Sequence, residues 1–457
     1  MENKKTAIHL MTEGDYKKEI IYFAIPLFIG NLFQQMYNTA DSLIVGNFLG
    51  PQALAAVSSV SSLVFLFTGF FMGFSTGAGV IISRAIGARD DERTRKAIHT
   101  TIALGILLSI IMTIVGVSMA PTILTWMGTP PDVFDLSCLY LRIYFGGFSG
   151  LIMYNMSTGI LQAAGDSKHP LYYLIISSLI NIVLDIAFIA VFHMGVDGAA
   201  IATVISEVFT AVLVIARLLR TPDPVRLHIT KIRFDSETLK RITEYGLPTA
   251  LQGSVIDISN ILIQSYINSF GSLAMAGIGA CTKAEGFIFL PVTAFSMAMT
   301  TYLSQNMGAG KYDRVKGGTR FGFLVSLTMI ESMGALFFIF AAPIVALFNR
   351  DPQVIAYGAA RARITGLFFM FVGYSHIASA VMRGLGRPMV PMVVMLTCWC
   401  AVRVTVLFTI GMVWHNIYLC YWIYPFTWLL SSAVFFLYLR STEKKIMGYY
   451  SPNKVDL

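Results

Sequence analysis

Residues 83–93 read SRAIGARDDER, and residues 304–314 read SQNMGAGKYDR. The two stretches share four residues at a constant separation of 221: Ser83/Ser304, Gly87/Gly308, Ala88/Ala309 and Arg93/Arg314. The same separation relates seven further pairs along the chain: Gly50/Gly271, Ala53/Ala274, Phe74/Phe295, Ser75/Ser296, Arg142/Arg363, Gly165/Gly386 and Pro170/Pro391. One separation held over so much of the sequence predicts that the chain consists of two copies of one ancestral unit.

The composition indicates a membrane protein. Of the 457 residues, 56% are hydrophobic and 13% are charged, compared with about 25% charged residues in soluble domains. A spanning helix needs about 20 mostly apolar residues. The sequence contains twelve such segments, near 20–46, 54–82, 97–120, 136–162, 170–193, 199–219, 241–267, 275–305, 320–347, 356–382, 389–413 and 417–439. We therefore predict an all-α integral membrane protein with twelve transmembrane helices.

The basic residues predict the orientation. The N-terminus, every second loop and the C-terminus together hold 27 of the 33 lysines and arginines, so both termini are expected in the cytoplasm. The polar start, MENKKTAIHLMTEGDYKKE, does not resemble a secretory signal, and the first span is expected to remain in place. Because the basic residues are divided among loops, they do not predict a nucleic-acid site.

Each copy holds six spans, an even number, so both copies are expected to cross the membrane in the same direction. Parallel repeats of this kind surround a central cavity in transporters. We predict an N-terminal lobe at 1–219, a cytoplasmic linker at 220–240 and a C-terminal lobe at 241–457. A cavity between two lobes of one chain needs no second subunit, so a monomer suffices. The five cysteines lie scattered in apolar runs and predict neither disulfides nor a metal site.

Two acids inside the expected spans are not repeated. Asp41 corresponds to Leu262, and Asp185 corresponds to Val406. Acids at membrane depth normally face a bundle interior or a watery cavity and take part in function. Asp41 and Asp185 are therefore predicted to act together, with Gln34, Asn181 and Thr203 nearby. For those three polar residues, hydrogen bonds that only join helices are the structural alternative.

Several stretches resemble the multidrug and toxic compound extrusion (MATE) family. They are AIPLFIGNLFQQMYNTADSLIVG, GLPTALQGSVIDISNILIQSYI, the paired GA loops and LQAAGDSKHP. The resemblance covers essentially the whole chain. It implies a multi-pass transporter of the inner membrane that exports bulky, mostly cationic drugs and dyes in exchange for protons or sodium, without a cofactor. The positions matching the family's polar N-lobe site are Gln34, Asp41, Tyr140, Asn181, Asp185 and Thr203.

The C-terminal half departs from the sodium-coupled branch of that family. This branch relies on acids in the seventh and tenth spans, whereas here the seventh carries Asp257, the eighth carries Glu285, and the tenth has His376 and no acid. Asp257 and Glu285 are candidates for attracting a cationic substrate, and an ion pair of Glu285 with Lys283 or Arg403 is the alternative. His376 is a substrate-site candidate, with a packing role as the alternative.

Four methionines, Met153, Met156, Met297 and Met299, suit a cavity that adapts to varied aromatic cations. Core packing explains them equally well. Because two carboxyl groups in one pocket titrate as a pair, Asp41 and Asp185 are expected to hold an exchangeable proton that competes with a cationic drug. The rival hypotheses are a flippase for lipid-linked sugars, which needs more cationic residues, an intramembrane enzyme, for which no catalytic motif occurs, and a receptor or channel.

Overall fold

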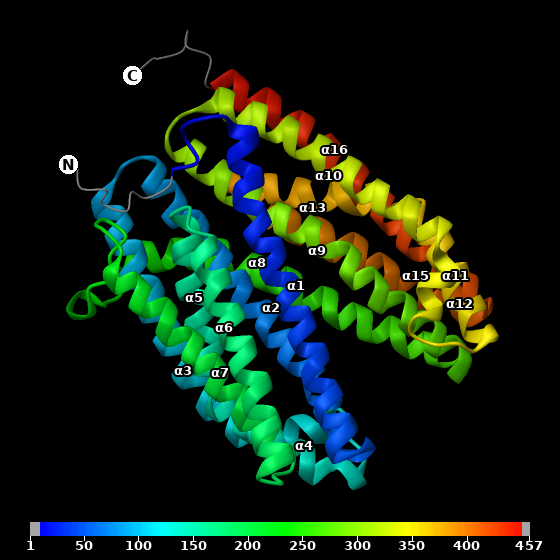
Figure 1. Cartoon of the computed structure of the whole chain (residues 1–457). Coiled ribbons are helices and arrows are strands. Elements are labelled where there is room, and N and C mark those ends of the chain that lie inside the picture. The colour runs from blue at the N-terminus through cyan, green and yellow to red at the C-terminus, as the bar shows by residue number, and fades with distance from the viewer. Residues whose placement is uncertain (1–9, 450–457) are drawn as a thin grey trace. The chain divides into compact units, whose positions relative to one another are not determined.

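The computed structural model describes residues 10–449 and consists of helices within that range (Figure 1). The helices of the first half are α1 (Tyr16–Leu49), α2 (Pro51–Gly87), α3 (Asp91–Trp126), α4 (Pro131–Gly146), α5 (Ser149–Ala163), α6 (Lys168–Asp185), the π-helix η1 (Ile186–Val191) and α7 (Val196–Arg220). A 3-10 turn, η2 (Ile229–Lys231), lies in the linker. Those of the second half are α8 (Ser236–Asn268), α9 (Ser272–Gly308), α10 (Tyr312–Ile339), α11 (Ala341–Ala346), α12 (Pro352–Gly366), α13 (Phe369–Gly384), α14 (Met389–Met395), the π-helix η3 (Leu396–Val402), α15 (Arg403–Val413) and α16 (Ile417–Tyr449).

The element bounds confirm the internal repeat. Helices α2 and α9 both have 37 residues, and both their first and their last residues are 221 positions apart. Helices α4 and α12 begin 221 residues apart at Pro131 and Pro352, each a proline in the first turn, where its missing N–H is no loss. The glycines that precede α2 and α9, Gly50 and Gly271, have φ values of 86° and 93°, a conformation that favours glycine.

The lengths and hydropathies of the helices support a multi-pass membrane protein. Among the described residues, nine helices are long and apolar enough to cross a membrane, and two bent helix pairs bring the number to eleven. Helix α8 covers the seventh predicted segment with 33 residues but is not among these candidates. The expectation of an all-helical membrane protein with two repeated halves is confirmed. Of the twelve predicted spans, α8 alone corresponds to a described helix that does not meet the length and hydropathy criteria for crossing a membrane.

Four of the predicted spans contain either a bend of more than 40° or a π-helical segment. The fourth is divided into α4 and α5, bent by 46°, and the tenth into α12 and α13, bent by 57°. The first break falls at Gly147, where an added Cβ would overlap the side chain of Val204 on α7, so glycine permits close packing there. The fifth and eleventh spans contain the π-helical segments η1 and η3.

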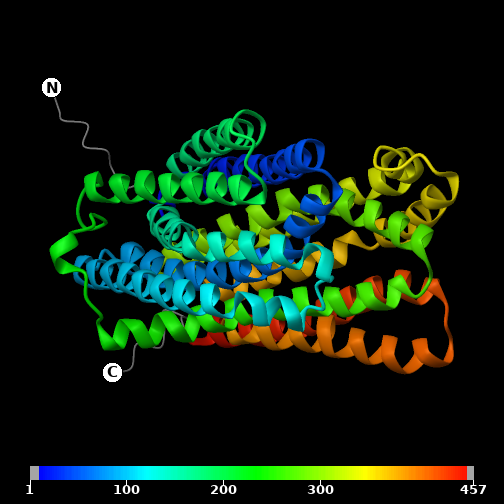
Figure 2. The same cartoon turned by 90° about the horizontal axis from the view of Figure 1, so that it is seen from below.

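The described chain divides into two compact units. The N-terminal unit contains the residues up to Ser254 together with Thr300–Val315, and the C-terminal unit contains Val255–Met299 and the residues from Lys316 onward. The predicted lobe limits at 219 and 241 and the central cavity stay predictions. In the N-terminal unit, α7 packs against both α5 and α6, and α1 packs along α6 (Figure 1). In the C-terminal unit, α16 packs against α12, α13 and α15. Figure 2 shows the red α16 beside the orange α15.

Helices α2 and α8 approach backbone to backbone within the N-terminal unit. A Cβ added to Gly77 would overlap the backbone nitrogen and Cα of Gly246, and one added to Gly73 would overlap those of Ala250. Small residues one turn apart allow two helices in a membrane to pack this closely.

Candidate functional site

Asp41 and Asp185 meet in the interior of the N-terminal unit, because α1 packs along α6. Asp41 is 9% exposed, Asp185 is fully buried, and their carboxyl groups interact with each other. The Oδ1 atom of each is buried and accepts no hydrogen bond. In the part of the chain that the structure describes, no ion pair involves either acid. Two buried acids without a basic partner are costly unless they bind a proton or a cation.

Asn181 and Thr203 adjoin this pair from α6 and α7. With its amide nitrogen turned toward the acid, Asn181 donates a hydrogen bond to Asp185 Oδ2 at 2.9 Å and accepts one from the Thr203 backbone N–H at 3.3 Å. Asn181 is fully buried and Thr203 is 5% exposed. The Thr203 hydroxyl donates to the Ala199 carbonyl, 3.0 Å away, one turn earlier in α7. Asn181 therefore fixes Asp185 to a neighbouring helix.

Three tyrosines and a third acid border the same site. The side chain of Thr203 interacts with the hydroxyl groups of Tyr37 and Tyr140, and both tyrosines lie in the electrostatic range of Asp41. Tyr140 stacks on Tyr144, whose hydroxyl donates to Glu207 Oε1 at 2.9 Å. The Glu207 Oε2 atom is buried without a hydrogen-bond partner. We call the set of eight residues the N-terminal polar cluster; its members are Tyr37, Asp41, Tyr140, Tyr144, Asn181, Asp185, Thr203 and Glu207.

Five of the six predicted coupling residues thus lie together. Gln34, the sixth, is half-buried two turns before Asp41 on α1, and among the described residues it makes no hydrogen bond to the cluster. The regular helix α6 ends at Asp185, and the π-helical segment η1 begins at the next residue. Short π-helical insertions are frequent at functional sites because they change the direction of a side chain within a helix.

Glu285 forms a buried ion pair in the C-terminal unit. Its Oε2 atom lies 2.8 Å from Arg361 Nη2, and the two side chains are 7% and 3% exposed. Thr365 donates to Oε1 of the same carboxylate at 3.0 Å. The ion-pair alternative for Glu285 is thereby realised, although with Arg361 in place of the expected Lys283 or Arg403.

The other two C-terminal candidates are half-buried. Asp257 lies on α8, and His376 lies on α13, where its ring meets the Trp399 ring edge-on with centroids 5.8 Å apart. A role of either residue in substrate binding stays a prediction. No group of three or more histidine, cysteine, aspartate or glutamate side chains within residues 10–449 has the arrangement of a metal site.

Comparison with known proteins identifies the family. The sequence profile named MatE matches residues 26–187 and 248–409, which are one segment in each repeat. The chain belongs to the MatE family. It is 29% identical over 431 residues to the probable multidrug resistance protein YoeA of Bacillus subtilis, covering 93% of each chain, and 29% identical over 447 residues to YpnP of the same organism, covering 96% of this chain and 98% of YpnP.

The fold agrees with this assignment. The solved outward-facing structure of a multidrug resistance MATE family transporter superimposes with a TM-score of 0.89 at 24% identity, covering 98% of this chain and all of that one. The expectations of a MATE family transporter, of a multi-pass membrane protein and of a chain that is not an enzyme are confirmed.

The four predicted methionines differ in their surroundings. Met156 and Met299 are fully buried, whereas Met153 and Met297 are half-buried. A Cβ added to Gly105 of α3 would lie 3.1 Å from the sulfur of Met153 and 3.3 Å from Met156 Cγ, so these two methionines fill the space above a glycine. Met299 packs in the same way on Gly322. The packing alternative is well supported for these three, and a part in substrate binding stays a prediction.

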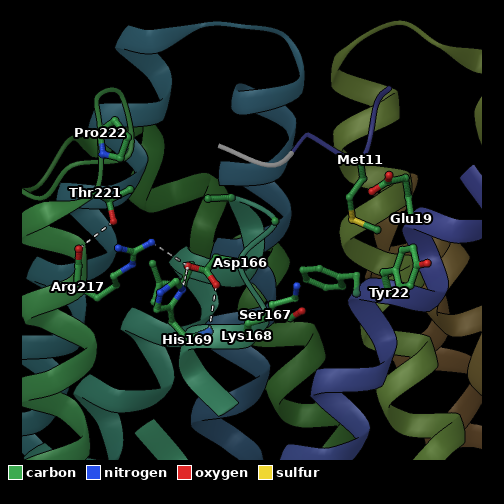
Figure 3. A pocket seen from close by; sticks show the side chains of 14 residues that line it. Met11, Glu19, Tyr22, Asp166, Ser167, Lys168, His169, Arg217, Thr221 and Pro222 are labelled. Atoms are coloured by element: carbon green, nitrogen blue, oxygen red, sulfur yellow. Dashed lines mark hydrogen bonds and ion pairs between the residues drawn. The ribbon is translucent and has the colours of Figure 1, made fainter. Parts of the chain in front are cut away.

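A cavity of about 430 Å³ lies elsewhere in the N-terminal unit, between the start of α1, the α5–α6 loop and the end of α7 (Figure 3). Asp166 faces into it and pairs with the His169 ring at 2.7 Å and with Arg217 at 3.7 Å. None of the residues predicted from the sequence lines this cavity. The contacts of Asp166 with His169 and Arg217 are local and stabilise the loop after α5.

Sequence reasoning assigned no site role to Tyr37, Tyr144, Glu207 or Arg361. The signal for three of them was helical spacing. Tyr37 lies four residues before Asp41, Tyr144 four after Tyr140, and Glu207 four after Thr203. Residues four apart occupy one helix face, so each adjoins a residue that had been assigned to the site.

Proposed function

We propose that this transporter exports bulky organic cations in exchange for protons that bind at the Asp41–Asp185 pair. The observation that supports the proposal is the burial of two interacting carboxyl groups with no ion-pair partner among the described residues. A cationic substrate supplies the charge that the pair lacks. The names of the two Bacillus subtilis relatives are consistent with drug substrates.

Exchange follows from competition for one negative site. Two neighbouring carboxyl groups bind protons as a pair, so the site loses negative charge each time one is taken up. The protonated pair attracts a cationic drug less, and the drug-bound pair binds a proton less well. Alternating exposure of such a site on the two membrane sides yields antiport. Asn181 and Thr203 hold Asp185 in place during this cycle.

Sodium is the alternative coupling ion. Carboxylate, amide and hydroxyl oxygens from Asp41, Asp185, Asn181 and Thr203 are hard ligands of the kind that alkali and alkaline-earth cations prefer.

Placement in the cell membrane with both termini in the cytoplasm is part of the same proposal, supported by the positions of the lysines and arginines. A monomer is sufficient for this mechanism.

The test uses purified protein in liposomes and follows ethidium movement with a pH gradient or a sodium gradient imposed alone. The expected result is transport driven by the pH gradient, reduced at least tenfold in Asp41→Asn and in Asp185→Asn. Asp132→Asn is the matched control, because Asp132 is an exposed acid in the first turn of α4. Transport driven only by sodium would replace the proton by sodium in the proposal. No transport with either gradient would contradict drug export and favour the lipid flippase.

A further inference from the structure

The repeat places a second buried polar group in the C-terminal unit, with a different charge. The residues 221 positions after Tyr140, Tyr144 and Thr203 are Arg361, Thr365 and Tyr424. All six side chains occupy corresponding positions of α4 and α12 or of α7 and α16. The N-terminal positions surround two acids, whereas the C-terminal positions include an arginine.

A second arginine adjoins this group. Arg361 and Arg403 both lie over the ring of Tyr424. The guanidinium carbon of Arg361 is 4.9 Å from the ring centroid, and that of Arg403 is 4.3 Å from it. Glu285 neutralises Arg361 through the 2.8 Å ion pair. Arg403 has no carboxylate within ion-pair distance among the residues that the structure describes. The group therefore carries one uncompensated positive charge.

Arg403 is unusually isolated for a buried arginine. It is 2% exposed, and its Nη2 donates one hydrogen bond, to the Thr427 hydroxyl at 2.9 Å. Its Nε atom is buried and has no hydrogen-bond partner. The Trp399 ring lies on another side, with its centroid 5.8 Å from the guanidinium carbon. Cation–π contacts with the two rings offset only part of the cost of burying a charge without a counter-ion.

Two further facts favour a ligand over a purely structural arginine. Arg403 adjoins a π-helical segment, since it directly follows η3, and such segments are frequent at functional sites. The Nε–H is a buried donor without a partner, and together with an Nη–H it forms the fork that holds an anion. A missing negative charge beside an unused buried donor matches a monovalent anion.

We infer that the C-terminal unit contains an anion site centred on Arg403, bordered by Trp399, Tyr424 and Thr427. Its ligand is a small monovalent acceptor, either free chloride or a carboxylate group. The inference does not depend on the proposed antiport, since binding to this site requires neither drug nor gradient.

The experiment measures anion binding to the purified full-length protein. Radiolabelled chloride is added to protein in a sulfate buffer, and unlabelled chloride or acetate is used as competitor at constant ionic strength. The expected result is saturable chloride binding near one ion per chain that Arg403→Gln reduces at least tenfold and that Arg403→Lys partly retains. Competition by acetate assigns the site to carboxylates as well, whereas competition by chloride alone limits it to halide.

A matched control is Arg383→Gln. Arg383 lies on α13, donates to the Ser379 hydroxyl at 2.8 Å and also has a buried Nε without a hydrogen-bond partner, so it tests whether any buried arginine gives the effect. It should leave chloride binding unchanged. If Arg403→Gln does not fold, Thr427→Val, which removes the hydroxyl beside the guanidinium, should weaken chloride binding in its place. Absence of saturable binding to the wild-type protein, or equal binding by Arg403→Lys, Thr427→Val and wild type, would overturn the inference.

Discussion

With its amide nitrogen turned toward the acid, Asn181 forms a buried hydrogen bond to Asp185 across one turn of α6, 2.9 Å from Asp185 Oδ2. Neither side chain is exposed. The same amide accepts from the Thr203 backbone on α7. One side chain thus links an acid of the proposed coupling pair to the helix packed against it, so the position of Asp185 depends on the packing of α6 and α7.

Replacement of Asn181 by alanine should impair transport without abolishing the fold. The change removes the donor to Asp185 Oδ2, and a hydrogen bond to a charged group contributes about 1.5–3 kcal/mol. We expect the rate of ethidium transport driven by a pH gradient to fall about tenfold or more in liposomes. Ser178→Ala is the control, because Ser178 lies one turn earlier and donates only to the Leu174 carbonyl. Equal rates in the two variants would contradict a positioning role for Asn181.

Glu207 is expected to influence coupling as a third acid of the N-terminal polar cluster. Tyr144 donates to it at 2.9 Å, and its other oxygen has no partner. Glu207→Gln should alter how ethidium transport varies with pH, because it removes one titratable group next to Tyr37 and Tyr140. Tyr144→Phe keeps the acid and removes the donor, and it should change the pH profile less than Glu207→Gln does. An unchanged profile in Glu207→Gln would exclude this acid from coupling.

The fold was predictable because its main signals are periodic and local. Apolar runs of spanning length and the constant separation of 221 residues predicted an all-helical membrane protein with two repeated halves. The break at Gly147 and the two π-helical segments were not predictable, because they depend on packing against neighbouring helices. The break at Gly147 depends on packing against α7, because the Val204 side chain occupies the space that a Cβ on Gly147 would need.

The residues of the candidate site could be singled out where a polar side chain interrupts an apolar run, but their pairing partners could not. Asp41 and Asp185 stand out in any apolar run, and they do come together. The partner of Glu285 could not be read from proximity in sequence, since Lys283, two residues away, is exposed and Arg361 lies on another helix. Tertiary packing alone brings Glu285 and Arg361 together.

A side chain at Gly77 should destabilise the N-terminal unit. A Cβ there would overlap the backbone of Gly246 on α8, which cannot move aside as a flexible side chain would. We expect Gly77→Ala to lower the stability by about 1–3 kcal/mol, the range for overpacking, measured by thermal unfolding in detergent. At Gly79 an added Cβ would lie 3.6 Å from the Gly159 carbonyl oxygen, an ordinary contact. Gly79→Ala should therefore have no destabilising effect, and similar losses in both variants would argue against the close approach.

Asp235, outside the spanning segments, should make the start of α8 sensitive to acid. Its Oδ1 accepts from the Thr238 backbone N–H at 3.0 Å and from the Thr238 hydroxyl at 2.6 Å, and these bonds lower the pKa of the carboxyl group. Because the pKa is lower in the folded state, the ionised carboxylate stabilises the fold at pH values above its unfolded-state pKa of about 3.9. This contribution disappears as the pH falls through the pKa of the folded state. Asp235→Ala should lower the melting temperature at neutral pH and have little effect near pH 3. An equal effect at both values would show that the charge is not involved.

Separating Glu285 from Arg361 should destabilise the C-terminal unit more than replacing both. Arg361→Met leaves a buried carboxylate without its cation, and loss of one partner of a buried ion pair typically costs about 3–5 kcal/mol. In the double variant Glu285→Gln/Arg361→Met, no charge is left unpaired, and Thr365 still has an oxygen to which it can donate. In thermal unfolding of the purified proteins, the double variant should therefore have a higher melting temperature than Arg361→Met. Arg363→Met is the control, because Arg363 lies on the same helix and is exposed, and its effect should stay within about 0.5 kcal/mol of wild type. A double variant less stable than Arg361→Met would mean that Glu285 contributes through contacts other than the ion pair.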